Sequence, residues 1–451
     1  GICSLNGDIA AASFDAKMTG EGVNDYLGAA VAGVGDVNGD GYDDVIAGAY
    51  LEDYGGSSAG ATYLLLGSVS GTVPSTIADG KFYGETANDR SGEALAGAGD
   101  VNDDHFDDIL IGATGDDDGG SNAGAAYLLM GPITGSSSLT VRDAKLTGEN
   151  AGDEAGSAVA GAGDLDGDGN ADILVGAVGY SNSAGATYVV YGPVSGDVSL
   201  TDADSYWVGE SSNDNSGSAV ASLGDWDADG LDDIIVGAYS DDDGGSAAGA
   251  AYIITDEGVG FSSLASSTVK LIGEFAGDRA GYSVDGAGDV NGDGYDDAIV
   301  GAYGDDTLAN NGGAAYVVFG QSAAPISIDL SIADAKLMGS DASGEAGWSV
   351  AGLGDIEPDG YADIAVGAQG ANNKAGYAYI IYGEFSGSMI LGDEGARIMG
   401  NDSKDRVGRS IDGAGDVNGD GFLDTIIGAQ GDDEAGGDSG ALYLFFGMEG
   451  M

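Results

Sequence analysis

The sequence predicts an all-β fold, and more narrowly a seven-bladed β-propeller with four-stranded blades. Three observations predict it: an acidic nine-residue motif recurs seven times, four strand-like segments accompany each copy, and the two ends of the chain carry complementary strands. Four-stranded blades are the building unit of propellers, and self-similarity at a fixed period is the sequence signature of repeat folds.

The repeat is defined by the starts of the acidic motif, which lie 61 to 66 residues apart. They are Asp36, Asp100, Asp164, Asp225, Asp289, Asp355 and Asp416. Each repeat contains the same four segments, which in the second repeat are residues 94–99, 109–113, 125–131 and 144–149. All four are short, rich in small or β-forming residues and bounded by turn residues, and they lack helical periodicity, so we expect strands.

The first and third segments have compositions that fit a ring of blades. First segments such as residues 30–33, 158–161 and 349–352 consist of small residues, which suits strands that converge on one axis, where bulky side chains would collide. The third segment, for example residues 315–319 (A-Y-V-V-F), is apolar on both faces and suits a sheet packed between two neighbours.

The termini predict how the ring closes. Residues 17–21 match the fourth strand of a repeat, but the first three strands of that repeat do not precede them. The last repeat stops after its third strand, at residues 441–447. We therefore expect the N-terminal strand to complete the last blade, which leaves no open sheet edge between the ends and makes residues 1–451 one domain. Because the sequence begins with Gly1, we also expect processing or excision from a longer protein.

The acidic motif, exemplified by residues 289–297 (D-V-N-G-D-G-Y-D-D), indicates a calcium loop. Ca²⁺ takes about six to eight oxygen ligands. Side chains at positions one, three and five, the backbone carbonyl at position seven and a closing carboxylate at position nine would supply them, while glycine at position six permits a sharp turn. The start of the motif matches an EF-hand loop, with aspartate at position nine in place of glutamate at position twelve.

A metal-free turn rich in Asp, Asn and Gly is the alternative, because these residues favour tight turns without an ion. Recurrence in seven repeats favours calcium, because a bare turn needs only one or two of them, and we expect up to seven Ca²⁺. The expected ligands are, loop by loop, Asp36, Asn38, Asp40, Tyr42 and Asp44; Asp100, Asn102, Asp104, Phe106 and Asp108; Asp164, Asp166, Asp168, Asn170 and Asp172; Asp225, Asp227, Asp229, Leu231 and Asp233; Asp289, Asn291, Asp293, Tyr295 and Asp297; Asp355, Glu357, Asp359, Tyr361 and Asp363; and Asp416, Asn418, Asp420, Phe422 and Asp424.

Two of the seven loops depart from the common pattern. The second has His105, the only histidine, in the glycine position, and we interpret it as a tolerated turn residue rather than a catalytic base. The sixth has Glu357 at position three, followed by Pro358. The longer glutamate must fold back to reach an ion, so we expect the sixth or the second site to be the weakest.

The charge of the chain excludes one class of partner. It has 76 acidic and 13 basic residues and a formal net charge of −63, so we expect no nucleic-acid partner, because phosphates are bound by Lys and Arg. The loops hold 29 of the acidic residues. Seven Ca²⁺ would leave about −49, so calcium alone does not account for the acidity, whereas a salty environment that screens repulsion would.

Three other features bound the class of protein. The one cysteine, Cys3, excludes an intramolecular disulfide and is interpreted as incidental rather than reactive. The chain has no apolar run of about eighteen residues, so we expect no membrane insertion. Apolar residues make up 43% of the chain, which is enough for a core and excludes disorder.

A second set of acidic residues recurs outside the loops, on the turns after the second and fourth strands. It comprises Glu85, Glu149, Glu210 and Glu274, Asp89, Asp153, Asp214 and Asp278, and residues 116–118, 241–243 and 432–434. Strand alternation places these turns on the face opposite the calcium loops. We interpret them mainly as solvated, turn-stabilising carboxylates. The nearby Tyr54, Tyr180, Tyr239 and Tyr303 are expected to pack within blades, with stacking on a glycan or peptide as the alternative.

The repeats resemble the FG-GAP repeats of the integrin α-subunit N-terminal propeller and of related bacterial surface proteins. Each unit carries x-G-x-x-(V/L/I)-x-(G/S)-x-G-D, then the acidic loop, then a hydrophobic strand ending in Gly-Ala. The Phe of Phe-Gly is absent from all seven units, and the Gly-Ala-Pro element ends instead in Tyr50, Thr114, Val178, Tyr239, Tyr303, Gln369 and Gln430.

The resemblance implies a recognition module with its ligand on the face opposite the calcium loops. Integrin α chains typically carry the cation motif on some blades, whereas every blade has it here, and pairing with a β subunit is not carried over. We therefore expect an extracellular or cell-surface, non-enzymatic propeller with structural Ca²⁺ and a protein or glycan ligand. A glycan hydrolase or lyase and a passive spacer of a larger surface protein remain alternatives, although scarce His, Lys and Arg argue against an enzyme.

Overall fold

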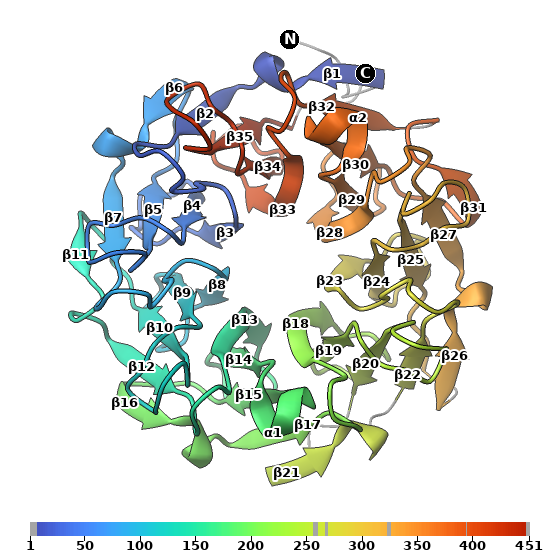
Figure 1. Cartoon of the computed structure of the whole chain (residues 1–451), viewed down its shortest axis with the longest axis horizontal. Helices are drawn as coiled ribbons and strands as arrows, with labels where there is room; N and C mark the ends of the chain where they lie inside the picture. Colours follow the sequence, from blue (N-terminus) through green and yellow to red (C-terminus); the bar gives the residue numbers. More distant parts are fainter. Residues whose placement is uncertain (1–6, 256–259, 267–268, 323–325, 394, 448–451) are drawn as a thin grey trace.

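The described residues form a ring of seven five-stranded sheets around a central axis (Figure 1). The computed structural model describes residues 7–255, 260–266, 269–322, 326–393 and 395–447. The predicted seven-bladed β-propeller is confirmed. Gly1 and Cys3 lie outside the described residues, so the predictions made for them stay predictions.

In each blade, four antiparallel strands run outward from the axis, in chain order except in blade 7, whose fourth strand comes from the N-terminal segment. The innermost strands of blades 1 to 7 are β3 (Val31–Gly35), β8 (Leu95–Gly99), β13 (Ala155–Gly163), β18 (Ser216–Gly224), β23 (Ser283–Gly288), β28 (Ala346–Gly354) and β33 (Val407–Gly415). The second strands are β4 (Asp44–Ala49), β9 (Asp108–Ala113), β14 (Asp172–Ala177), β19 (Asp233–Ala238), β24 (Asp297–Ala302), β29 (Asp363–Ala368) and β34 (Asp424–Ala429).

The outer strands follow the same order. The third strands of blades 1 to 7 are β5 (Ala61–Leu65), β10 (Ala125–Leu129), β15 (Ala186–Val190), β20 (Ala250–Ile254), β25 (Ala314–Val318), β30 (Tyr377–Ile381) and β35 (Ala441–Phe445). The fourth strands are β7 (Gly80–Tyr83), β12 (Ala144–Thr147), β17 (Ser205–Val208), β22 (Val269–Ile272), β27 (Ala335–Met338), β32 (Ala396–Met399) and β2 (Ala16–Thr19). Every third strand is buried along its whole length, as predicted for sheets packed on both faces.

The expectation of four strands per blade needs one correction, because each sheet has a fifth, outermost strand. These strands, for blades 1 to 7, are β11 (Ser137–Ser138), β16 (Gly196–Ser199), β21 (Gly260–Ser263), β26 (Ser327–Asp329), β31 (Gly387–Ile390), β1 (Gly7–Ala10) and β6 (Gly71–Pro74). Each pairs in parallel with the fourth strand of its blade. In the chain, however, β11, β16, β21, β26, β31 and β6 lie just before the fourth strand of the following blade. Each blade thus covers the outer edge of its neighbour.

The N-terminal segment closes the ring as predicted. Strand β2 pairs antiparallel with β35, with Ala16 opposite Leu444 and Thr19 opposite Ala441, and so forms the fourth strand of blade 7. The preceding strand β1 pairs with β32 of blade 6, which the sequence did not predict. The first described residues therefore tie together two blades that are formed by the C-terminal part of the chain (Figure 1).

The described residues also contain a few helical turns, where only strands were expected. Five 3₁₀ turns follow the fifth strands or precede the fourth: η1 (Ala11–Ser13), η2 (Ser75–Ile77), η3 (Leu200–Asp202), η4 (Leu264–Ser266) and η5 (Leu330–Ile332). Two one-turn helices, α1 (Tyr180–Ser183) and α2 (Ala371–Lys374), replace the turn after the second strand in blades 3 and 6. None of the helices described is long and apolar enough to cross a membrane.

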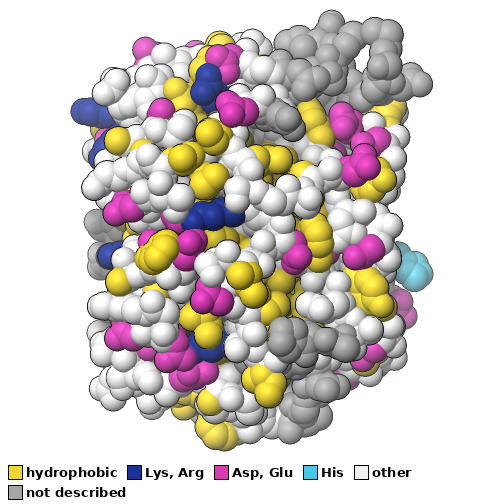
Figure 2. Space-filling view, turned by 90° about the vertical axis from the view of Figure 1, so that its right-hand side faces the viewer, with side chains coloured by type: hydrophobic (Ala, Val, Ile, Leu, Met, Phe, Trp, Pro, Cys, Tyr) yellow, Lys and Arg dark blue, Asp and Glu magenta, His cyan; other side chains and the backbone are white. Residues whose placement is uncertain are grey.

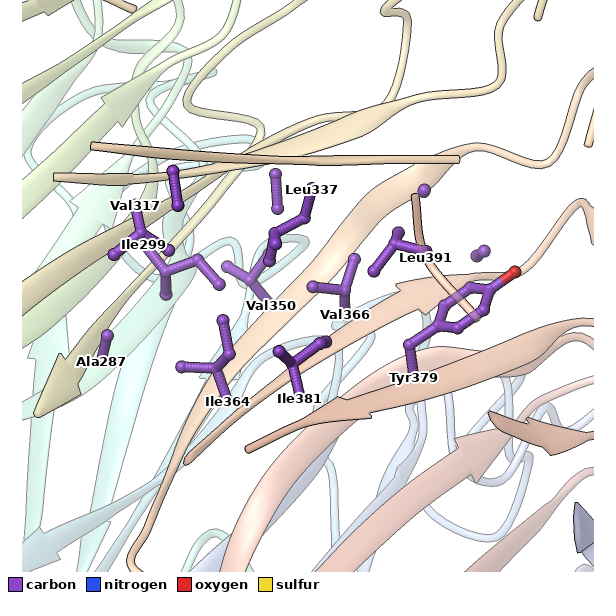
Figure 3. Packing of buried hydrophobic residues seen from close by; sticks show 14 of the residues in the cluster. Ala287, Ile299, Val317, Leu337, Val350, Ile364, Val366, Tyr379, Ile381 and Leu391 are labelled. Carbon is purple, nitrogen blue, oxygen red and sulfur yellow. The ribbon is translucent and has the colours of Figure 1, made fainter. Parts of the chain in front are cut away.

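Neighbouring blades pack face to face through apolar side chains. Figure 3 shows Val317 and Leu337 of blade 5 lying against Val350 and Val366 of blade 6, and all four are buried. Burial of this kind contributes about 25 cal/mol for each Å² of apolar surface removed from water. The interfaces between blades therefore form the hydrophobic core of the ring.

Close to the axis, this packing leaves no room for a side chain at one position of each second strand. A Cβ built on Gly176 of blade 3 would lie 2.0 Å from the carbonyl oxygen of Gly217 in blade 4. The equivalent glycines Gly48, Gly112, Gly237, Gly301, Gly367 and Gly428 would each meet the next blade at 2.0 to 2.2 Å. The Gly-Ala that ends every second strand is therefore required for closing seven blades around one axis.

Gly176→Ala should destabilise the protein by about 1–3 kcal/mol, the usual cost of overpacking, because the new Cβ meets backbone that cannot retreat without opening the interface. Unfolding in urea measures the effect. Gly437→Ala is the matched control, since it lies in an exposed turn where the nearest atom would be 3.9 Å from the Cβ. Equal effects of the two substitutions would contradict this account of the glycine.

Candidate metal centres

The seven predicted calcium loops join the first strand to the second strand of every blade, so they lie on one face of the ring. In each blade the ninth residue of the loop is also the first residue of the second strand, for example Asp44 in β4 and Asp297 in β24. In the side view of Figure 2, the single histidine, which belongs to loop 2, lies at one edge of the ring. The Lys and Arg side chains visible there lie toward the opposite edge.

The carboxylate at position one organises the loop through backbone N–H groups. In loop 5, Asp289 Oδ1 accepts hydrogen bonds from the N–H groups of Gly292 at 2.6 Å and Asp293 at 3.0 Å, and its Oδ2 accepts from Gly294 at 2.9 Å. Asp293 Oδ1 in turn accepts from Tyr295 N–H at 3.1 Å. In the other loops too, the backbone N–H groups at positions five and six donate hydrogen bonds to the carboxylate at position one. Each loop is thus curled around its own carboxylates.

The carboxylate at position nine is fully buried in all seven blades. Asp297 Oδ2 accepts from Val290 N–H at 3.0 Å, and its Oδ1 accepts from Gly320 N–H, at the end of the third strand, at 2.9 Å. Burial raises the pKa of Asp297 to about 7, and the nearby charges of Asp293 and Asp289 add to the rise. Two hydrogen bonds therefore do not offset the loss of water around this carboxylate.

The six equivalent carboxylates behave in the same way. Burial is the first cause in each, and it raises the pKa of Asp44, Asp363 and Asp424 to about 7, that of Asp108 and Asp172 to about 6, and that of Asp233 to about 8. Acidic groups at positions one, three or five of the same loop contribute to every rise. Each loop therefore favours a proton or a cation beside its buried carboxylate.

The oxygen atoms converge as a calcium site requires most clearly in blades 3 and 4. In loop 3, carboxylate oxygens of Asp164, Asp166 and Asp172 lie within 4.8 Å of one another, and in loop 4 those of Asp225, Asp227 and Asp229 do. Oδ1 of Asn102 in loop 2 and Oδ1 of Asp227 are buried without a hydrogen-bond partner among the described residues. Both occupy position three, so the donor set fits a hard, oxygen-binding cation.

In the part of the chain that the structure describes, the other five loops lack such a group of expected ligands. In loop 2 the converging groups are Asp100, Asp103 and His105, of which only Asp100 was expected to be a ligand. In loops 1, 5, 6 and 7 the acidic side chains form no group of three within the described residues. This geometry does not separate loop 6 from loops 1, 5 and 7, so the expectation that the sixth or the second site is the weakest stays a prediction.

The structure also reveals a contact between loops that the sequence analysis missed. Asp107, at position eight of loop 2, accepts a hydrogen bond from Asp36 N–H of loop 1 at 2.9 Å. Asp43, Asp232 and Asp296 cap the preceding loop in the same way. The signal was present, because four of the seven motifs have aspartate at position eight, but its partner lies in another repeat.

The acidic turns on the opposite face are neutralised by lysines. Lys145 Nζ lies 2.8 Å from Asp116, 2.6 Å from Asp118 and 3.1 Å from Glu85 of the preceding blade. It also lies 5.1 Å from the ring centroid of Tyr127, whose hydroxyl donates to Asp116. Glu85, Asp116 and Asp118 lie close enough together to hold a metal, but the ammonium group already occupies that position.

Four other blades repeat this cluster on the fourth strand, with Lys17, Lys81, Lys270 and Lys336 over Tyr443, Tyr63, Tyr252 and Tyr316. Blades 3 and 6, whose second turns are the one-turn helices, have Tyr206 and Arg397 instead of lysine. These lysines were not identified from the sequence, because their acidic partners lie 27 to 62 residues away, and those of Lys17 lie 415 and 417 residues away.

The prediction of solvated, turn-stabilising carboxylates was half right. Asp89 accepts from Thr86 N–H at 2.6 Å and so stabilises its turn, but it is only 2% exposed. Asp153, Asp214 and Asp278 behave alike. These aspartates are buried because the neighbouring blade covers their turns.

The four tyrosines expected to pack within blades do contact other rings. Tyr54 lies edge-on to Tyr83, although it is 71% exposed, and Tyr180 lies edge-on to Tyr188. Tyr239 and Tyr303 instead lie near the axis, where both contact the ring of Tyr282.

Comparison with known proteins agrees with this architecture. Residues 27–65, 91–129, 155–190 and 346–381 match the FG-GAP repeat. Integrin alpha-V of Gallus gallus is 33% identical over 225 residues, which is 47% of this chain and 20% of that protein. Integrin alpha pat-2 of Caenorhabditis elegans is 33% identical over 221 residues, 46% of this chain and 17% of that protein. The chain thus carries FG-GAP repeats and resembles an integrin α propeller, while the alignments span about a fifth of the relatives' length.

Without metal, the protein should lose stability as the pH rises from 6 to 8.5. The position-nine carboxylates have folded-state pKa values of about 6 to 8, above the unfolded value of about 4. Their protonation therefore stabilises the folded state fully below pH 4, and this contribution is lost as the pH rises through the folded pKa. Melting temperatures in EDTA at stepped pH values measure it. A flat or rising melting temperature over this range would contradict the assignment, and calcium should reduce the dependence.

His105→Gly should stabilise the calcium-loaded protein by about 1 kcal/mol, by removing strain from a left-handed backbone position. His105 has φ 73°, where the other six loops have glycine with φ between 89° and 97°. Urea unfolding in calcium buffer measures the gain. His105→Ala is the control, because it removes the imidazole but keeps the Cβ, and an equal gain from alanine would show that backbone strain is not the cause.

Proposed function

We propose that this chain is a non-enzymatic, calcium-stabilised propeller for extracellular or cell-surface recognition or adhesion, with residues 1–451 as one domain and a structural Ca²⁺ in each of the seven loops. The observation that carries the proposal is the buried position-nine carboxylate, which recurs in every blade together with acidic or amide residues at positions one, three and five of the same loop. The expected ligands are those at positions one, three, five, seven and nine.

A structural role for the metal follows from where the loops lie. Each loop joins the first strand to the second, and in six blades position nine also ties it to the end of the third strand. An ion bound there would therefore hold three segments of the blade. The folded loop gathers the oxygens and the unfolded chain does not, so calcium would stabilise the protein by mass action. It would also offset repulsion among the acidic groups of the loop.

Two observations support a recognition role: the resemblance to integrin α chains, and a cavity on the face opposite the acidic loops. That face has a central cavity with a volume of about 750 Å³, within the usual range of ligand pockets, and this argues against a passive spacer. We place a protein or glycan ligand there. The shortage of basic residues argues against a nucleic acid.

A glycan-active enzyme is the second candidate, because two glutamates line the same cavity. Burial and the charge of Glu93 raise the pKa of Glu154, as a general acid would need. If this candidate is right, Glu154→Gln should abolish the release of reducing ends or unsaturated products from a glycan library. If the wild-type protein releases neither, the enzyme is rejected.

Chelation should lower the melting temperature by well over about ten degrees, because several sites would lose binding free energy together. Differential scanning calorimetry of a calcium-loaded sample, before and after excess EDTA, measures the shift. Readdition of Ca²⁺ should restore it. An unchanged melting curve would contradict the structural role of calcium.

Asp166→Ala tests one site within the same experiment. Asp166 is an exposed position-three ligand in loop 3, so its loss should reduce the calcium-dependent part of the melting temperature and leave the EDTA value nearly unchanged. Asp202→Ala, which removes an exposed carboxylate outside the loops, should change neither. An equal calcium-dependent loss in both variants would count against a site in loop 3.

A further inference from the structure

The central cavity is lined by the beginnings of all seven innermost strands. The residue that follows the first glycine of each strand reaches it in every blade, and these residues are Ala29, Glu93, Ser157, Ser218, Tyr282, Trp348 and Arg409. The positions on either side are nearly uniform, with glycine before and alanine or serine after. The repeats therefore differ most at the position that faces the cavity. Packing constrains the residue type least at this position, and contact with a ligand would constrain it most.

The variation divides the cavity into two unlike walls. Blades 5 and 6 contribute an aromatic wall, in which the ring centroids of Tyr282 and Trp348 are 4.7 Å apart and those of Tyr303 and Trp348 are 5.0 Å apart. Glu93, Ser157 and Ser218 contribute small or polar groups from blades 2 to 4. An apolar plate facing hydrogen-bonding groups suits a sugar ring, which has apolar C–H faces and a polar edge.

Arg409 adds a positive charge that the protein does not pair. Its guanidinium lies 5.2 Å from the ring centroid of Trp348, and its Nε donates to Gln430 Oε1 at 3.2 Å. In the described part of the chain Arg142, Arg397 and five lysines have an ion pair. Arg409 has none within that part, and the same is true of Arg90, Arg279, Arg406, Lys374 and Lys404. Glu93, Glu154 and a second arginine, Arg90, line the same cavity, but among the described residues neither glutamate forms an ion pair with Arg409. The Arg409 guanidinium therefore has room for an anion from outside.

Two further observations point in the same direction. Burial lowers the pKa of Arg409, as expected for a charge that has lost water without gaining a partner. Trp348 Nε1 is buried and has no hydrogen-bond partner among the residues described. Unsatisfied buried donors are costly, so this N–H would gain from an oxygen acceptor that came within its reach.

We propose that the cavity binds a sugar residue that carries a carboxylate, with the ring against Tyr282 and Trp348 and the carboxylate on Arg409. This inference rests on the proposed recognition function and names its ligand class. An acidic peptide would satisfy Arg409 but would leave the aromatic wall without a ring to cover it.

The test is titration calorimetry of the calcium-loaded protein with 3′-sialyllactose and trigalacturonate, each against its neutral counterpart, lactose and maltotriose. At least one acidic sugar should bind about tenfold or more tightly than its counterpart, as a charge-assisted hydrogen bond would give, and added NaCl should weaken it. Quenching of tryptophan fluorescence reports the position, because Trp207 and Trp226 are buried and Trp348 lies at the cavity.

Arg409→Met should weaken binding of the acidic sugar about tenfold or more, with little effect on any neutral sugar. Arg142→Met is the matched control, since it removes the same charge from an arginine paired with Glu85 and Asp197, and it should bind like the wild type. Ser157→Trp, which would fill the cavity from its opposite wall, should abolish binding and serves if Arg409→Met fails to fold.

The proposal is overturned if neither acidic sugar binds more tightly than its neutral counterpart, or if the folded Arg409→Met and Ser157→Trp variants bind like the wild type. If instead acidic peptides of a peptide array bind and lose binding in Arg409→Met, the ligand class is wrong and the recognition function stands. A melting temperature insensitive to EDTA would refute the calcium-stabilised propeller itself, whatever the sugars do.

Discussion

The buried carboxylate at position nine is the interaction on which each blade depends. It begins the second strand, accepts an N–H from the start of the loop and, in six blades, accepts another from the end of the third strand. One side chain thus fixes three segments, at the cost of removing a charge from water. That cost is lowest when a cation lies beside it, so the geometry that builds the blade is also the geometry that favours a metal.

The two faces of the ring differ in how their acidic charge is balanced. On the loop face, 29 acidic residues have few cations of their own, and under the proposed function ions from the medium would neutralise them. On the opposite face, four lysines of the fourth strands lie between acidic groups from two adjacent blades, as Lys145 does between Asp116 and Glu85, whereas Lys17 pairs with two acidic groups of its own blade. Four of the lysine clusters therefore link blades without any ion, whereas stability of the loop face should follow the composition of the solution.

How far the sequence could predict the structure depended on how local the signal was. The period, the acidic motif and the terminal strands are local, and they predicted the propeller, its closure and the loop positions. The fifth strands were missed because a segment as short as β11, Ser137–Ser138, has no pattern of its own and is defined by pairing with β7 of the preceding blade. The convergence of Tyr282, Trp348 and Arg409 was missed for the same reason, because they come from three repeats.

The backbone of the ring is nearly sevenfold, but a binding site needs one preferred orientation, and side chains near the axis supply the asymmetry. After the first glycine, blades 5, 6 and 7 place Tyr282, Trp348 and Arg409 at the cavity, whereas blades 1 to 4 have small or acidic residues at the same position. Blades 5 and 7 also differ from the others deeper along the axis. There Asp285 and Asp412 accept hydrogen bonds from N–H groups of the next blade, whereas the other five blades have alanine at the equivalent position. Because glycine and alanine fix the backbone, such substitutions change what the axis binds without disturbing how the blades pack.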